Sequence, residues 1–115
     1  MPRDVRVYLH DVKSAGDEIL DYTQGMAFEQ YRTDGKTRRA VERCLAIIGE
    51  ALVQARQKGL TDVEHLPRVQ SVIDLRNFLV HEYTKVKDEV IWQVLEQHLP
   101  VLLKAVDNLL ESGTA

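Results

Sequence analysis

Apolar residues recur every three or four positions along most of the 115-residue chain, and no stretch alternates strictly between apolar and polar residues. This spacing is typical of amphipathic α-helices rather than of strands. It predicts four main helices, which cover about Asp4 to Thr23, Ala40 to Ala55, the segment after Pro67, and Val90 to Leu109. Short connections between such helices favour an all-α fold, an up-and-down antiparallel bundle of four to five helices.

Glycine and proline residues divide the pattern further. Gly59 is expected to cap the long helix, Pro67 suits a helix start, and Asp88 is a candidate N-cap. Pro100 interrupts the last helix, and since proline lacks a backbone N–H, we expect a kink or a change of turn there. Residues 26–32 are expected to form a short helix or a turn.

Composition limits the classes of protein that remain. The chain is 44% hydrophobic and 29% charged, as expected of a single globular domain over residues 1–115. Its net charge of -3 excludes a generally basic nucleic-acid binder, so any RNA site must be a local patch. Cys44 is the single cysteine, which favours a reducing, cytoplasmic location. No apolar run is long enough for a signal peptide or a membrane span.

The segment RNFLVHEY, residues 76–83, places four polar groups at the end of an apolar run. On an ideal helix, Asn77 and His81 share one face, Arg76 and Tyr83 nearly coincide, and Arg76 and His81 lie about 140° apart. One helix alone therefore does not aim Arg76 and His81 at the same atom. Either the helix ends near His81, or two copies of the protein each contribute an Arg and a His.

These groups suit cleavage of RNA by its own 2′-hydroxyl without a metal ion. Histidine transfers protons near neutral pH, and the planar guanidinium of Arg76 matches phosphate oxygens. Asn77 can orient His81 or bind a phosphate oxygen, and Tyr83 can stack on a base or donate its hydroxyl. The same spacing also occurs in surface ion pairs and helix caps, so the residues alone leave a structural role open.

Three segments in the same order resemble one family. They are LRNFLVHEY with its Arg-x4-His-x-Tyr motif, VERCLAIIGEAL at residues 41–52, and DEVIWQVLEQHLPVLL at residues 88–103. Together they resemble the HepT-like toxins, a minimal branch of the HEPN ribonuclease superfamily. One departure is Glu82, where relatives often carry glycine between the His and the Tyr.

The resemblance implies an all-helical, HEPN-like fold and a homodimer in which two Arg/His pairs face a shared cleft. It further implies a metal-independent endoribonuclease that is the toxin of a toxin–antitoxin pair, with no cofactor. The implied antitoxin is an MNT-type nucleotidyltransferase, which can neutralise the toxin by adding AMP to the motif tyrosine, here Tyr83.

The basic cluster and Glu50 each allow more than one interpretation. A basic cluster is either a patch for the RNA backbone or a solvated helix face, and it comprises Lys36, Arg38, Arg39 and Arg43. Glu50 is expected to pair with Arg76 or Arg43, more in a structural than in a catalytic role. No histidine or cysteine spacing predicts a metal site.

We weigh three hypotheses. The first is an RNA-cleaving toxin in which Arg76, Asn77 and His81 are catalytic. The second is a non-catalytic subunit that binds a nucleotide or a partner nucleotidyltransferase at the same residues. The third is a structural bundle in which Arg76 and His81 are ordinary surface residues.

Overall fold

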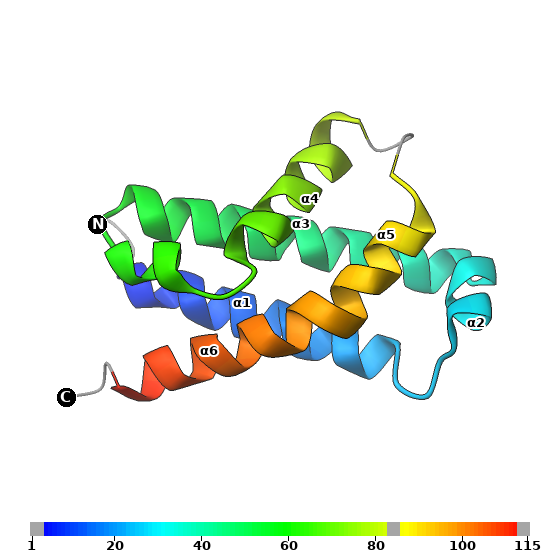
Figure 1. Cartoon of the computed structure of the whole chain (residues 1–115), viewed down its shortest axis with the longest axis horizontal. Helices are drawn as coiled ribbons and strands as arrows, with labels where there is room; N and C mark the ends of the chain where they lie inside the picture. Colours follow the sequence, from blue (N-terminus) through cyan, green and yellow to red (C-terminus); the bar gives the residue numbers. More distant parts are fainter. Residues whose placement is uncertain (1–3, 83–85, 113–115) are drawn as a thin grey trace.

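The computed structural model describes residues 4–82 and 86–112, and every regular element within them is helical (Figure 1). This confirms the all-α bundle. The elements in chain order are α1 (Val5–Tyr22), α2 (Phe28–Thr33), α3 (Gly35–Gln57), the 3-10 helix η1 (Thr61–His65), α4 (Val69–His81), α5 (Asp88–Gln93), the π-helical segment η3 (Val94–His98) and α6 (Leu99–Ser112). None of the described helices is both long and apolar enough to cross a membrane.

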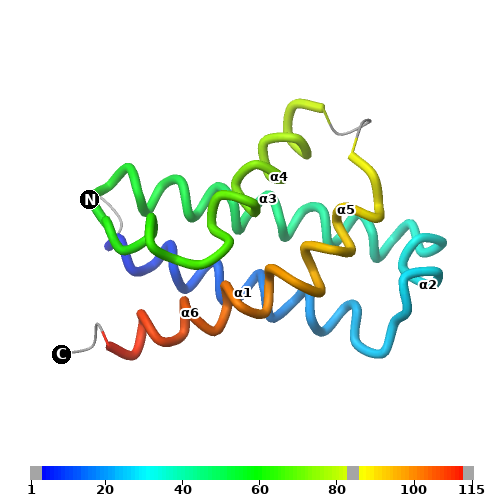
Figure 2. Tube along the Cα trace, viewed as in Figure 1, coloured from blue at the N-terminus to red at the C-terminus, as the bar shows by residue number. Residues whose placement is uncertain are grey.

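Helix α3 lies at the centre of the arrangement. It runs antiparallel to α1 on one side, and α4 crosses it at an incline on the other (Figure 1). Helix α6 returns antiparallel to α1, so the last helix closes the bundle (Figure 2). The apolar stripes of these helices meet in one core, whose fully buried side chains include Leu9, Val12, Ile19, Leu45, Ile48, Leu52 and Leu102.

Both ends of α3 follow from local sequence chemistry. Asp34 separates α2 from α3 and caps α3, because its Oδ1 accepts the backbone N–H of Thr37 at 3.0 Å. At the other end Gly59 adopts a φ of +104°, which a glycine reaches without steric cost. The N–H of Leu60 then bonds the carbonyl of Ala55, and that of Gly59 bonds Arg56. This Schellman pattern confirms the predicted cap.

Helix α4 carries the motif and ends within it. The helix begins at Val69, two residues after Pro67, and Arg68 precedes it with a left-handed φ of +65°. His81 is its last residue, and the N–H of Glu82 bonds the carbonyl of Phe78 at 2.7 Å. The helix therefore ends at the histidine, as the first of the two sequence alternatives requires.

The last helix differs in part from its prediction. Asp88 is the first helical residue of α5 rather than its N-cap, because the extended residue before the helix is Lys87. The carboxylate of Asp88 instead accepts a hydrogen bond from Arg38 across the bundle at 3.1 Å. The change of turn predicted at Pro100 is present just before it: in η3 the N–H of Leu99 bonds the carbonyl of Val94, five residues back. This wider turn precedes the residue that has no N–H to donate.

Candidate active site

Arg76 lies against α3 at a position where only glycine fits. A Cβ added to Gly49 would lie 2.5 Å from Cγ of Arg76 and closer still to its Cβ. Real Cβ atoms do not approach so closely, so the bare backbone at Gly49 is what lets the stem of Arg76 pack there. The sequence places this glycine next to Glu50, which reaches the end of the same arginine.

The guanidinium of Arg76 is fixed by two side chains. Its Nη2 donates to Oε2 of Glu50 at 2.5 Å, and its Nη1 donates to Oδ1 of Asn77 at 2.9 Å. The Arg76 side chain is 22% exposed. The expected pairing of Glu50 is thus confirmed with Arg76, one of its two predicted partners.

Arg76 keeps donors for a ligand. A guanidinium has five N–H groups, and the two bonds above engage one on each Nη atom. Its Nε is buried and has no hydrogen-bond partner among the described residues. A partly exposed arginine with its fork held in place and N–H groups to spare suits the binding of a phosphate.

His81 is exposed at the end of α4 and lines a shallow hollow together with Asn77, Phe78 and Glu82. Asn77 therefore connects the two parts of the motif, since it lines this hollow and also accepts the hydrogen bond of Arg76. The structure brings Arg76, Asn77 and Glu50 together and places His81 beside Asn77. It does not bring Arg76 into the hollow of His81. Tyr83 lies outside the described residues.

The four members of the basic cluster have different surroundings. Arg38 is half-buried and pairs with Asp88. Arg39 is 71% exposed and pairs with Glu42 on the same helix at 3.0 Å. Arg43 and Lys36 are exposed, and in the described part of the chain neither has an ion pair. The predicted cluster is thus one structural residue, Arg38, and three surface residues.

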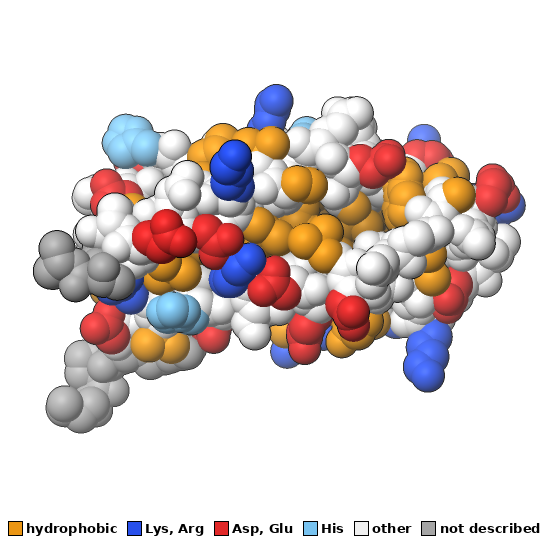
Figure 3. Space-filling view, turned by 90° about the horizontal axis from the view of Figure 1, so that it is seen from below, with side chains coloured by type: hydrophobic (Ala, Val, Ile, Leu, Met, Phe, Trp, Pro, Cys, Tyr) orange, Lys and Arg blue, Asp and Glu red, His pale blue; other side chains and the backbone are white. Residues whose placement is uncertain are grey.

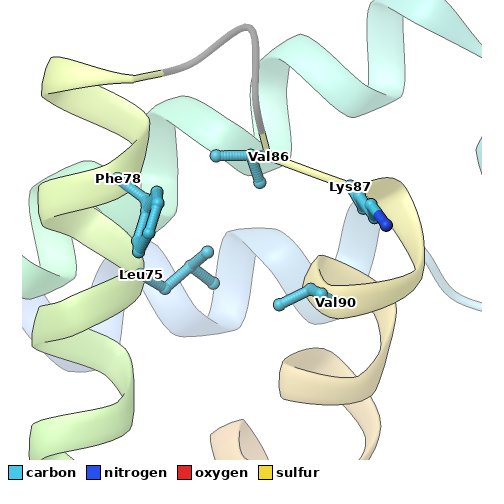
Figure 4. Close-up of a pocket in the computed structure, with 5 residues that line it drawn as sticks. All are labelled: Leu75, Phe78, Val86, Lys87 and Val90. Carbon is cyan, nitrogen blue, oxygen red and sulfur yellow. The ribbon is translucent and has the colours of Figure 1, made fainter.

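An apolar hollow of about 340 Å³ lies between α4 and α5 beside the motif. Figure 4 shows the side chains of Leu75, Phe78, Val86 and Val90 pointing toward one another around it. Phe78 is 54% exposed and Val90 is 46% exposed, which is high for large apolar side chains. A second band of hydrophobic side chains crosses the middle of the face seen from below in Figure 3. Exposed Leu20 on α1 and Val101 on α6 also lie outside the core.

Cys44 has a structural role, and the described residues hold no metal-binding group. Cys44 is buried in the core, and its thiol donates to Oε2 of Glu18 at 3.5 Å. Burial, with help from that carboxylate, raises the pKa of Cys44 to about 11, so the thiol stays protonated near neutral pH. No group of three or more His, Cys, Asp or Glu residues that could hold a metal ion occurs within residues 4–82 and 86–112.

The arrangement defines a class: a helical protein that carries a fixed guanidinium and an exposed imidazole on one helix. A family model described as "Ribonuclease HepT-like" matches residues 12–109. The chain therefore belongs to the ribonuclease HepT-like family.

Curated relatives agree with this assignment. "Putative RNase MJ0127" of Methanocaldococcus jannaschii is 30% identical over 112 residues, which cover 96% of this chain and 92% of the relative. "Probable ribonuclease HepT" of Thermococcus cleftensis is 33% identical over 113 residues, which cover 95% of this chain and 98% of the relative. No solved structure matches the chain.

Sequence reasoning did not predict the space that Gly49 leaves for Arg76 or the exposure of Phe78 beside the motif. A glycine inside a long helix is destabilising unless another backbone or side chain needs the space, so Gly49 could have been noticed from its position alone. Phe78 carries no such signal, because an exposed phenylalanine and a buried one look the same in an amphipathic pattern.

Proposed function

We propose that this protein is an endoribonuclease that cleaves RNA by attack of a 2′-hydroxyl on the adjacent phosphodiester. The observation that carries the proposal is the guanidinium of Arg76, fixed by Glu50 and Asn77, with Asn77 in turn beside His81. Membership of a family named for its ribonuclease supports the same reaction.

In this reaction His81 accepts the proton of the 2′-hydroxyl as the oxygen attacks phosphorus. The bond from phosphorus to the 5′-oxygen breaks, and that oxygen takes a proton from a second imidazole as it leaves. The products are a 2′,3′-cyclic phosphate and a 5′-hydroxyl. Arg76 binds the non-bridging oxygens and stabilises the charge that develops on them. Its permanent charge does the work that a metal ion would otherwise do.

The second imidazole is the reason to propose a homodimer. The exposed face of α4 carries Asn77, Phe78 and His81, so a second copy placed against it sets two Arg/His pairs along one cleft. If the cleft is shared, exchanging wild-type subunits with an excess of His81→Ala subunits lowers the cleavage rate, because each mixed dimer keeps one imidazole where the reaction needs two. Wild-type cleavage that is unaffected by the excess of His81→Ala subunits contradicts a shared cleft.

The test of the reaction is RNA cleavage by the purified protein. We expect His81→Ala and Arg76→Ala to lower the cleavage rate at least 100-fold, in line with the loss of a general base or of a charge-stabilising donor. The wild type should leave 2′,3′-cyclic phosphate ends, cut in the presence of a chelator and spare an all-DNA substrate. Loss of cleavage with chelator, or full activity in His81→Ala, rejects this mechanism.

We also propose that the protein is a cytoplasmic toxin and that an MNT-type nucleotidyltransferase neutralises it by adding AMP to Tyr83. The support is the sequence motif, in which Tyr83 follows His81 by two residues. An AMP phosphate on Tyr83 adds negative charge two positions after His81 in the sequence and would compete with RNA. Intact mass after co-expression with such an enzyme should show added AMP units on the wild type and none on Tyr83→Phe.

The alternative is a non-catalytic subunit that binds nucleotide or a partner at the same residues. RNA binding without turnover, together with normal growth of cells that express the protein alone, would favour that alternative over the ribonuclease.

A further inference from the structure

A groove between α3 and α4 lies on the side of α4 that carries Arg76. Its lining residues are Arg39, Glu42, Arg43 and Ala46 from α3, and Leu79 and Val80 from α4. Its volume is about 440 Å³. Val80 follows Arg76 by one helical turn, so both face the same side of α4.

A stripe of residues on α3 links the groove to the candidate site. Arg39, Arg43 and Ala46 recur at helical spacing, and Glu50 continues the same stripe one turn beyond Ala46. Glu50 follows Arg39 by eleven positions, which is about 16 Å along the helix axis. Since Glu50 binds Arg76, the stripe leads from Arg39 to the guanidinium that we assign to the scissile phosphate.

The charges of the groove favour an anionic ligand. Two arginines line it against one carboxylate, Glu42, in a molecule whose net charge is -3. Glu42 pairs with Arg39, whose side chain is 71% exposed, and ion pairs of exposed side chains contribute little to stability. Lys36 is exposed three residues before Arg39 on the same stripe and adds a third positive charge.

The opposite wall is apolar. Val80 is 47% exposed and Leu79 is partly buried beside it. A positive rim next to an exposed apolar wall suits a single nucleic-acid strand, whose phosphates meet the cations while a ribose or base lies against the apolar side chains. Arg38 contributes nothing here, because it is held by Asp88 instead.

We propose that this groove is an RNA-binding subsite in which Arg39 and Arg43 hold backbone phosphates of a single strand that continues to Arg76. The inference rests on the proposed ribonuclease function and adds to it the path of the strand outside the cleaved bond. It also divides the basic cluster: Arg39 and Arg43 contact RNA, and Arg38 stabilises the fold.

The test is binding of a fluorescent single-stranded RNA to the full chain in a His81→Ala background, measured across a range of salt concentrations. We compare Arg39→Gln/Arg43→Gln with Lys58→Gln/Lys104→Gln, which removes the same charge from exposed positions outside the groove. Each phosphate contact contributes about 0.7 to the slope of log affinity against log salt. The salt slope of the groove variant should therefore be about 1.4 smaller than that of the wild type, and its RNA affinity about tenfold lower. The control variant should keep the slope and the affinity of the wild type.

A lysine variant completes the design. Arg39→Lys/Arg43→Lys keeps both charges and should recover most of the affinity, and circular dichroism checks that all variants fold. Equal losses of RNA affinity in the groove and control variants, or no loss in either, overturn the proposed subsite. If the wild type cuts RNA while the groove variant binds RNA normally, the subsite is rejected and the ribonuclease function stands. If the wild type neither binds nor cuts RNA, the proposed function and the groove both fail.

Discussion

At position 49 the lack of a side chain decides where Arg76 lies. The arginine stem occupies the space that a Cβ would need, and the neighbouring carboxylate of Glu50 then meets the guanidinium. Gly49 thus positions the stem of Arg76 by packing, and the adjacent Glu50 positions its guanidinium by charge. This arrangement explains why a site with few polar groups can still present a guanidinium in one orientation.

We predict that Gly49→Ala lowers the free energy of unfolding and the cleavage rate together. The steric overlap with Arg76 lowers the free energy of unfolding by about 1–3 kcal/mol, and the higher helix propensity of alanine raises it by about 1 kcal/mol. Gly35→Ala is the control, because its Cβ would meet only a guanidinium nitrogen of Arg38 at 3.6 Å. Urea unfolding and RNA cleavage measure both effects, and a Gly49→Ala protein as stable and active as Gly35→Ala contradicts the role of Gly49.

Sequence reasoning at this scale singled out Arg76, Asn77 and His81 as candidates but did not indicate how their side chains are held. Glu50 had two possible partners, because Arg43 precedes it by two turns on α3 and Arg76 lies on a separate helix, α4. Only the crossing of α4 over α3 decides between them, and side-chain spacing within one helix carries no information on that crossing.

At the scale of elements, α3 depends on its first turn. Asp34 accepts the N–H of Thr37 through Oδ1 and the hydroxyl of Thr37 through Oδ2 at 2.8 Å. These bonds, with the backbone bond contributing most, lower the pKa of the Asp34 carboxyl. A lowered pKa means that the ionised form stabilises the fold. That stabilisation is present above the unfolded value of about 4 and is lost as pH falls through the folded value.

We predict that Asp34→Ala lowers the melting temperature by roughly 2–6 °C at pH 7, since it leaves N–H groups of the first turn without an acceptor. Asp34→Asn keeps an acceptor oxygen and should melt close to the wild type. The gap between wild type and Asp34→Ala should narrow when the pH is lowered below about 4. Calorimetry at several pH values checks this, and an unchanged gap in acid would exclude a contribution from the carboxylate charge.

Helix positions were largely predictable, because the 3.6-residue pattern and the glycine signals are local. The prediction for Asp88 was wrong by one residue, since Lys87 is the N-cap of α5. The partner of the Asp88 carboxylate could not be predicted, because Arg38 lies fifty residues earlier in the chain. The π turn before Pro100 was predictable as an interruption but not as a type of turn, since a proline is compatible with a kink, a break or a wider turn.

At the scale of the whole molecule, the distribution of exposed apolar side chains bears on assembly. Phe78 and Val90 border the hollow between α4 and α5, next to His81, whereas Val101 is exposed on α6. Exposed apolar surface of this kind often marks a contact with another protein. The position of Phe78 beside the motif favours its face as the contact between copies that our mechanism requires.

We predict that Phe78→Asp shifts the protein toward monomer and lowers RNA cleavage at least tenfold, because a charge there must be desolvated on association. Val101→Asp removes a similarly exposed apolar side chain on α6 and should change neither property. Sedimentation equilibrium and cleavage assays on the same samples measure both. A Phe78→Asp protein that remains dimeric, or a wild type that is monomeric and fully active, rules out this interface.

The sequence predicted the helical fold and its family, but it did not indicate which apolar residues remain exposed. Phe78 and Leu75 both fit the apolar pattern of α4, yet Phe78 is 54% exposed and Leu75 is buried. Burial depends on how distant elements pack, which a single sequence does not display.

The π turn at Val94–His98 also fixes how the two halves of the last helix are rotated relative to one another. One additional residue in a turn offsets the halves by about 100° of helical phase. The first half thereby faces α2, where Trp92 packs against Tyr31, and the second half faces α1. Removing one residue from this turn would restore an unbroken α-helix, but either α5 would lose its contact with α2 or α6 would lose its contact with α1. The number of residues in this one turn therefore sets the position of α5 beside α4.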